Sequence, residues 1–322
     1  MSDAWTWHGG ALAAAQRYFG GTDWIDLSTG INPHPWPSAA DMVFDWQRLP
    51  DPAALAALEA AAASYFGVDP RHVCAVPGSE IGLRLVGALV GGPAQHMAPG
   101  YRTHGAMIAG GTAVDPEATR ESRGTLILAN PNNPDGRVID GAAVLELLAD
   151  RNGWLLVDEA FADTDPAHSV AAAVGDDQRL VVFRSFGKFF GLAGARLGFV
   201  IAAPALLAAL RDRLGAWPLA AAAIAIGTVA YADQGWIAAT RARLLREASA
   251  LDAVLGRHGH QPIGACPLFR LIAVDDTRAL FERLARRAIL TQPFDDQPRW
   301  LRIGLPADGD ALARLDAALA DG

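Results

Sequence analysis

The residue best suited to chemistry is Lys188, which lies in a glycine-rich segment, SFGKFFGLAGARLG, at residues 185–198. Apolar runs on either side of this segment predict two buried strands, one entering it and one leaving it. An amine that is flanked by aromatic rings and partly desolvated favours its neutral form, so it can condense with a carbonyl group. In the same segment, Ser185 and Arg196 can donate hydrogen bonds to a phosphate.

Residues that suit a flat, phosphorylated ligand follow two other predicted strands. After a strand at 73–76, the turn Gly78-Ser79 precedes a helix. The free N–H groups and the dipole of a helix N-terminus favour a bound anion. After a strand at 95–98 comes Tyr101, whose ring is well placed to stack on a flat ligand.

Two further apolar runs end in polar residues. The first leads into NPNNPDG at residues 130–136, where the prolines fix the backbone so that an asparagine amide can point at a ligand. The second, Trp154-Leu155-Leu156-Val157, ends in Asp158. Together these strand ends predict one site that is assembled from distant parts of the sequence.

Composition narrows the class of protein. The 322 residues are 51% hydrophobic and 19% charged, which predicts a sizeable core, and the net charge of -8 argues against nucleic acid as the main partner. The two cysteines, Cys74 and Cys266, lie in apolar settings that suit the reducing cytoplasm. We find no signal peptide, no run long enough to span a membrane and no cluster with metal-ligand spacing. We therefore expect a cytoplasmic protein with no bound metal and no membrane partner.

The segment around Lys188 resembles the cofactor-binding segment of the pyridoxal 5'-phosphate (PLP) enzymes of the aspartate aminotransferase fold, fold type I. The resemblance covers nearly the whole chain and implies an α/β architecture. It implies a large domain with a mostly parallel seven-stranded sheet between helices, plus a small α+β domain. We expect an N-terminal arm at 1–38 that packs with the small domain, a large PLP-binding domain at 39–233 and the small C-terminal domain at 234–322. A helical stretch is expected from 204 to 232.

The same resemblance implies roles for the residues at the strand ends. Lys188 would form a Schiff base with PLP, and Asp158 would pair with the protonated pyridine nitrogen, which keeps the ring an electron sink. Asn133 would donate a hydrogen bond to the phenolic oxygen of the cofactor, and Tyr101 would stack on its ring. The residues expected to hold the cofactor phosphate are Gly78, Ser79, the backbone of Glu80, Ser185 and Arg196.

Three residues outside these motifs are expected to bind the substrate. Asn32 is a candidate ligand for the substrate carboxylate, or else it forms only an Asx-turn before the proline that follows it. Arg302 would clamp the substrate carboxylate, with Arg299 as the alternative. His8 is the candidate anchor for a distal group of the substrate, or else a solvated histidine near the N-terminus.

Several positions depart from the pattern of typical aminotransferases. Phe161 stands where many of them carry a tyrosine, and Leu49 stands where relatives usually place a tyrosine that reaches the neighbouring subunit's cofactor. Arg102 and His104 also differ from the residues often found at their positions. With His8, they are the basic residues left to bind a second phosphate, that of the substrate.

Three features narrow the resemblance: Phe161, the short chain, and the N-terminal His-Gly-Gly followed by DLSTGINP. They resemble the threonine-phosphate decarboxylases of cobalamin biosynthesis. This implies a small phosphorylated amino acid as substrate and a homodimer with active sites near the interface. Two other interpretations remain open: a histidinol-phosphate aminotransferase, and a regulatory protein that binds PLP without catalysis. The complete set of Lys188, Asp158, Asn133 and Arg196 argues against the second.

Overall fold

The computed structural model describes residues 3–121 and 124–320. Contacts divide it into two units. The large unit contains residues 35–133 and 138–239, and the small unit contains the chain up to His34, residues 134–137 and the chain from Thr240 onward. The sequence did not predict that residues 134–137 belong to the small unit. The three predicted domains, at 1–38, 39–233 and 234–322, stay a prediction.

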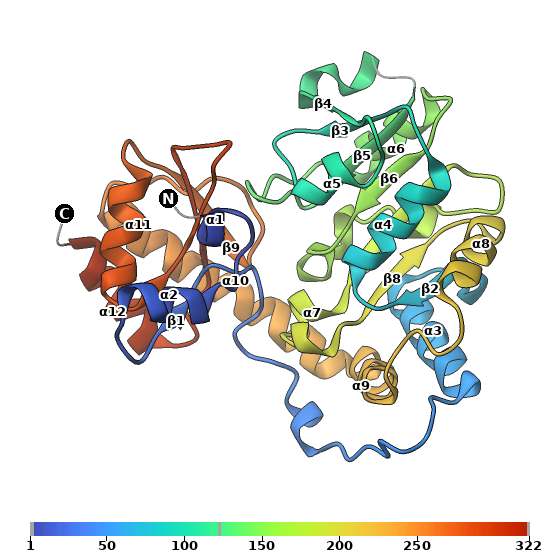
Figure 1. Ribbon diagram of the computed structural model, residues 1–322, viewed down its shortest axis with the longest axis horizontal. Helices are drawn as coiled ribbons and strands as arrows, with labels where there is room; N and C mark the ends of the chain where they lie inside the picture. The colour runs from blue at the N-terminus through green and yellow to red at the C-terminus, as the bar shows by residue number, and fades with distance from the viewer. Residues whose placement is uncertain (1–2, 122–123, 321–322) are drawn as a thin grey trace. The chain divides into compact units, whose positions relative to one another are not determined.

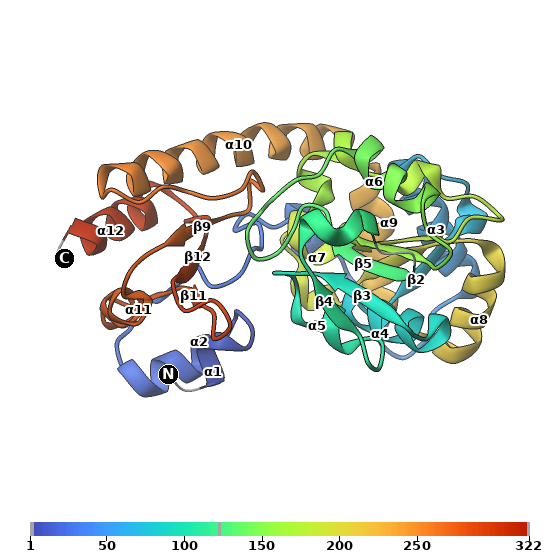
Figure 2. The ribbon, with the colours of Figure 1, turned by 90° about the horizontal axis from the view of Figure 1, so that it is seen from above.

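The large unit is built on one seven-stranded sheet (Figures 1 and 2). Its strand order is β2-β8-β7-β6-β5-β3-β4. The bounds in that order are β2 Val73–Val76, β8 Gly198–Ile201, β7 Leu180–Ser185, β6 Leu155–Asp158, β5 Thr125–Ala129, β3 Ala94–Met97 and β4 Thr112–Val114. β8 runs antiparallel to both of its neighbours, and every other pairing in this sheet is parallel. The mostly parallel seven-stranded sheet is therefore confirmed.

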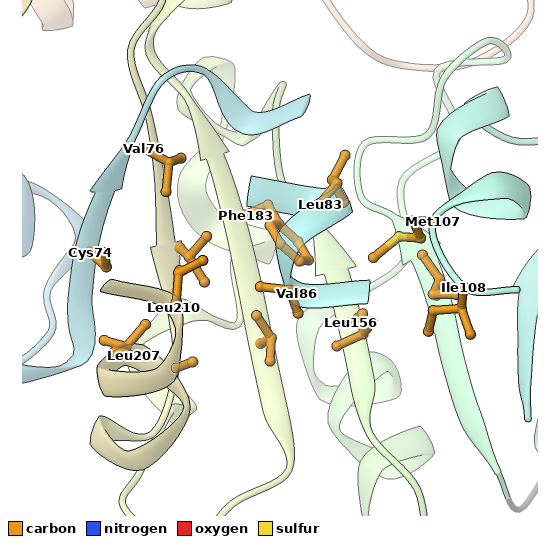
Figure 3. Packing of buried hydrophobic residues seen from close by; sticks show 14 of the residues in the cluster. Cys74, Val76, Leu83, Val86, Met107, Ile108, Leu156, Phe183, Leu207 and Leu210 are labelled. Atoms are coloured by element: carbon orange, nitrogen blue, oxygen red, sulfur yellow. The ribbon is translucent and has the colours of Figure 1, made fainter. Parts of the chain in front are cut away.

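The central strands β5, β6 and β7 consist entirely of buried residues. Strands that are covered on both faces have no reason to alternate polar with apolar residues, which explains the continuous apolar runs in the sequence. Phe183 of β7 belongs to a buried cluster with Leu83 and Val86 of one helix and Leu207 and Leu210 of another (Figure 3).

The helices of the large unit lie before, between and after its strands in the chain. They are α3 Pro52–Phe66, α4 Ser79–Val90, α5 Arg102–Ala106, α6 Gly141–Ala149, α7 Phe186–Phe189, α8 Pro204–Leu214 and α9 Ala221–Ala232. Short 3-10 helices lie at Pro37–Asp41, Pro70–His72, Pro116–Glu121, Ala162–Thr164, Pro166–His168, Ala171–Ala173 and Ala193–Ala195. No described helix is both long enough and apolar enough to cross a membrane.

The expected helical stretch from 204 to 232 is wrong in its continuity. α8 ends at Leu214, and Gly215 follows with a φ of 69°. Trp217 also has a positive φ, of 54°, and Pro218 comes directly after it. A left-handed glycine and a proline both end a helix, so the chain turns here before α9 begins.

The small unit combines short strands with helices. β9 Phe269–Ala273, β11 Gln292–Pro293 and β12 Trp300–Gly304 form an antiparallel sheet in the order β11-β12-β9 (Figure 2). β1 Ile25–Asp26 pairs in parallel with β10 Ile289–Leu290. The helices are α1 Asp3–Thr6, α2 Leu12–Phe19, α11 Thr277–Arg286 and α12 Gly309–Ala320, and α10 Gln234–Arg257 begins in the large unit and continues into the small one.

One buried cluster of charges lies between β6 and β7. Arg184, the residue before Ser185, forms ion pairs with Glu159 and Asp163, and all three side chains are almost fully buried. Its guanidinium carbon also lies 4.6 Å from the centre of the Phe66 ring. Burial raises the pKa of Glu159, while Arg184 opposes that rise. Each buried charge in this cluster has a partner, so removing one partner would leave an uncompensated buried charge.

Replacing this arginine should therefore destabilise the fold. Arg184→Met leaves two buried carboxylates without their cation, and we expect a loss of about 3 to 5 kcal/mol in the free energy of unfolding. Urea denaturation of the full chain measures it. Arg120→Met is the matched control, because Arg120 pairs with Glu146 at the surface, where the expected loss is about 1 kcal/mol or less. Equal losses in the two variants would contradict the account.

Candidate active site

One cavity of the large unit is lined by residues from the ends of several strands. Six predicted site residues line it, together with four neighbours from β5, β6 and the loops that follow. The lining residues are Ser79, Glu80, Tyr101, Ala129, Pro131, Asn133, Asp158, Ala160, Phe161 and Lys188. The parallel strands β5 and β6 both end at this cavity, as expected for a ligand site at the carboxyl edge of such a sheet.

Lys188 lies in α7, the short helix that directly follows β7. Its side chain is half-buried, and its Nζ lies 5.5 Å from the centre of the Phe161 ring. The electron-rich face of an aromatic ring attracts an ammonium group. A tyrosine is common at the position of Phe161 in the resembled family, and here a bare ring faces the lysine instead.

Asp158 ends β6 with both carboxylate oxygens engaged. Its Oδ1 accepts a hydrogen bond from the backbone N–H of Ala160 at 3.0 Å, and its Oδ2 lies 3.0 Å from Nε2 of His104. The carboxylate is 6% exposed, so it is held in place and shielded from most solvent. Because a carboxylate can only accept, Nε2 carries the proton in this pair.

The structure corrects the interpretation of His104. From the sequence, we expected that His104, like His8 and Arg102, could bind the phosphate of the substrate. Its ring is instead fully buried and contacts Asp158. The signal in the sequence was the spacing: Tyr101 and His104 lie three residues apart at the start of α5, so both side chains can serve one site.

The residues expected to hold a phosphate converge at the start of α4. Gly78, with a φ of 86°, precedes this helix, and a Cβ placed on it would lie 2.6 Å from Nη2 of Arg196. A Cβ placed on Gly198 would lie 2.4 Å from the backbone N of Ser79. Gly198 is also the strand partner of Ser185. A side chain at Gly78 would therefore collide with Arg196, and one at Gly198 would collide with the backbone of Ser79. Gly78, Ser185 and Arg196 are not among the residues that line the cavity.

This arrangement fits PLP. Hydroxyls, a guanidinium and helix N–H groups are the donors that a phosphate needs. The half-buried amine of Lys188 suits covalent attachment to an aldehyde, and the buried carboxylate of Asp158 suits a protonated ring nitrogen. Asn133 and Tyr101 line the same cavity.

The three residues expected to bind substrate lie in the small unit. Arg302 is buried, its Nη2 donates to the carbonyl oxygen of Ser28 at 2.7 Å, and its guanidinium lies 5.2 Å from the centre of the Phe269 ring. The alternative, Arg299, is exposed and forms an ion pair with Asp275.

His8 belongs to a segment that packs against the same backbone carbonyl. A Cβ placed on Gly9 would lie 2.2 Å from the carbonyl oxygen of Ser28, the atom to which Arg302 donates. The backbone N–H of Gly10 donates to the Ser28 hydroxyl at 2.8 Å. Gly9 is therefore needed for close approach, and its contact with Ser28 brings this segment to the carbonyl group that Arg302 also contacts. The His8 side chain itself is exposed.

Asn32 is buried, and its Oδ1 accepts two hydrogen bonds. One comes from the backbone N–H of His34 at 3.0 Å, which is an Asx-turn, and the other comes from Nη2 of Arg243 at 3.2 Å. The turn and the predicted substrate role are compatible, because both bonds use the oxygen of the amide. Nδ2 would be the donor in the predicted role.

The comparisons with known proteins agree with this geometry. The family model Aminotransferase class I and II matches residues 111–318, and the chain belongs to that family. A threonine-phosphate decarboxylase from Sinorhizobium sp is 41% identical over 97% of both chains, and one from Pseudomonas aeruginosa is 42% identical over 97% of this chain and 96% of that protein. A crystal structure of histidinol-phosphate aminotransferase from Sinorhizobium meliloti with pyridoxal-5'-phosphate superimposes with a TM-score of 0.85, at 23% identity, over 95% of this chain and 92% of that one.

A methyl group at Gly78 tests the phosphate cradle. Gly78→Ala introduces a Cβ against Arg196 in a left-handed backbone conformation, so we expect PLP affinity to fall about tenfold or more. Gly67→Ala is the control, since Gly67 has a φ of 70° but no atom within 4 Å of the added Cβ. Both variants should lose about 1 kcal/mol of stability from backbone strain. Titration with PLP, followed by fluorescence, separates them; unchanged affinity in Gly78→Ala would count against the cradle.

Proposed function

We propose that this protein is a PLP-dependent carboxy-lyase. It decarboxylates L-threonine O-3-phosphate to (R)-1-amino-2-propanol phosphate, a step of cobalamin (vitamin B12) biosynthesis. The observation that carries the proposal is the 41–42% identity to two threonine-phosphate decarboxylases along nearly the whole length of each chain. The cavity with Lys188, Asp158 and Asn133 supplies the groups that such chemistry needs.

The large unit would hold the cofactor. Lys188 would attach to it covalently, Tyr101 would cover one face of its ring, and Asn133 would donate to its phenolic oxygen. Its phosphate would lie among Gly78, Ser79, the backbone of Glu80, Ser185 and Arg196. The bound cofactor supplies a ring that withdraws electrons from the bond broken at Cα.

Asp158 would keep the ring nitrogen protonated, and His104 would hold the carboxylate in the orientation needed. In the reaction, the bond between Cα and the carboxylate carbon breaks, carbon dioxide leaves, and the electron pair stays on the Cα side. A proton must then reach Cα. The Nζ of Lys188 is the group of this cavity that is suited to carry it.

The choice of bond depends on how the substrate is held. With PLP bound, the bond that breaks would be the one held perpendicular to the plane of the ring, because its electrons would then be withdrawn into the ring. Arg302 and Asn32 would bind the carboxylate, and His8, with Arg102 as a further candidate, would bind the substrate phosphate. Two anchors on one small substrate fix its rotation about Cα.

Histidinol-phosphate aminotransfer is the alternative activity, and binding of PLP without catalysis is a more distant one. Both the decarboxylase and the aminotransferase act on a small amine that carries a distal phosphate. The structural likeness to a histidinol-phosphate aminotransferase, at 23% identity, shows a shared fold and does not bear on the activity. The proposal therefore favours the decarboxylase.

A homodimer and a cytoplasmic location complete the proposal. Residues 42–45 and 48–51 line a mainly apolar groove with residues of α3 and α9; Val43 and Leu49 in this lining are 95% and 65% exposed, and Trp46 beside it is 75% exposed. An apolar surface of this kind is typical of an interface between subunits. Neither Cys74 nor Cys266 forms a disulfide, and both are buried, which suits a reducing compartment.

Asp158→Asn tests the electron sink. The variant should fold and bind PLP but lose about 4 kcal/mol or more of transition-state stabilisation, because a neutral amide does not hold the ring nitrogen protonated. His104→Ala should cost less, a factor of about 10 to 100 in rate, through loss of one buried hydrogen bond. Single-turnover kinetics with bound PLP measure both. Asp177→Asn, at an exposed position, is the control, and a mild effect in Asp158→Asn would mean that another acid serves.

The substrate is tested with threonine phosphate and no keto acid. We expect carbon dioxide and aminopropanol phosphate, little reaction with unphosphorylated threonine, and a raised KM with unchanged product in His8→Ala. Released carbon dioxide and the phosphorylated amine are measured directly. Amino transfer from histidinol phosphate to 2-oxoglutarate, without carbon dioxide from threonine phosphate, would replace the lyase with the aminotransferase.

A further inference from the structure

The side chain of Glu80 has surroundings that its backbone role does not explain. Glu80 lies in the first turn of α4, and its carboxylate accepts hydrogen bonds from three neighbouring side chains. Tyr101 donates its phenolic hydrogen to Oε2 at 3.1 Å, the hydroxyl of Thr103 lies 2.9 Å and 3.0 Å from the two oxygens, and Nε of Arg84 donates to Oε1 at 2.7 Å.

A carboxylate at this place needs those partners. A helix N-terminus favours a negative charge, but the cofactor phosphate is expected at the same terminus and repels it. Arg84, one turn along α4, compensates the charge of Glu80, and two hydroxyls satisfy its oxygens. The carboxylate is therefore neutralised locally and directed toward the turn that carries Tyr101 and Thr103.

The phenolic hydroxyl of Tyr101 donates its hydrogen bond to Glu80. Burial, and then the negative charges of Glu80 and Asp158, raise the pKa of Tyr101 to about 12, and only the bond to Thr103 acts in the opposite direction. The His104 ring lies edge-on to the Tyr101 ring, with 5.7 Å between their centres. Lys188 lines the same cavity. The hydroxyl therefore stays protonated through the neutral pH range, and its hydrogen bond goes to the carboxylate of Glu80.

We propose that Glu80 is a positioning residue, whose carboxylate fixes the ring of Tyr101 and the turn at residues 101–104 against the N-terminus of α4. The proposal rests on the proposed function only in placing PLP against Tyr101. The same turn carries His104 to Asp158, so Glu80 joins the phosphate end of the site to its carboxylate end. The hydroxyl of Tyr101 therefore holds its ring in place and does not transfer a proton in the reaction.

The test compares cofactor release from the full-length holoenzyme. Tyr101→Phe and Glu80→Leu should each speed PLP release about tenfold, the equivalent of one lost hydrogen bond to a charged group. The double variant should release PLP no faster than the worse single variant, because both changes remove one interaction. Glu80→Gln keeps an acceptor oxygen and should restore most of the retention. Glu146→Leu, at an exposed ion pair, is the matched control.

Two further readouts separate positioning from loss of folding. The visible circular dichroism of bound PLP should weaken in Glu80→Leu and recover in Glu80→Gln. In the cofactor-free chain, Glu80→Gln should lower the pKa of Tyr101 from about 12, because a negative charge is removed, as the ultraviolet absorbance of the phenolate reports.

Additive effects of Tyr101→Phe and Glu80→Leu, or release from Glu80→Leu at the wild-type rate, would overturn the proposal. These measurements need no substrate. A protein that retains PLP as expected but yields no carbon dioxide from threonine phosphate would refute the proposed activity and leave the role of Glu80 intact. A protein that binds no PLP would refute both.

Discussion

The candidate site depends on the way that neighbouring parallel strands end at one edge of a sheet. β5 and β6 run in the same direction and in close register, so Ala129 lies opposite Asp158. Residues that are far apart in the chain thereby come to line one cavity. Since parallel strands are covered on both faces, only their ends remain accessible, and the polar residues of these strands gather there.

A second constraint lies behind that edge. Arg184 and Ser185 are consecutive residues of β7, and the arginine is surrounded by Glu159, Asp163 and Phe66. Glu159 directly follows Asp158 in the chain. The ion-paired cluster therefore holds the ends of β6 and β7 together, immediately beside the residues that would contact the cofactor. The consecutive residues Asp158 and Glu159 divide these two roles, because Asp158 lines the cavity and Glu159 pairs with Arg184.

Local motifs predicted most of the site residues, because each candidate residue lies within a few positions of the end of its strand. Asn133, Asp158 and Lys188 were predicted in this way, and all three line the cavity. The contact of His104 with Asp158 was not predicted, because it joins residues 54 positions apart and depends on where α5 packs. The pairing of β1 with β10 was missed for a similar reason: each strand is two residues long and has no periodicity to detect.

Apolar runs predicted individual strands and the family resemblance implied their arrangement, while the errors lay where one residue redirects the chain. The seven-stranded sheet agrees with the expectation from the resemblance. The break between α8 and α9 was overlooked because alanine-rich sequence continues beyond it, while the backbone conformation of Gly215 decides the outcome. Helix propensity is a sum over many residues, and a single left-handed position outweighs it.

The two glycines at the proposed phosphate site limit how far the sequence can diverge. A hydroxyl donor such as Ser79 or Ser185 has a chemical substitute in threonine, so the donor set tolerates some exchange. Gly78 and Gly198 have no such substitute, because even a methyl group would meet Arg196 or the backbone of Ser79. In a diverging sequence, replacing one of these glycines by alanine would therefore abolish cofactor binding more readily than exchanging one hydroxyl donor for another. In distant homologues, these two glycines should then be a more durable mark of this site than any polar group.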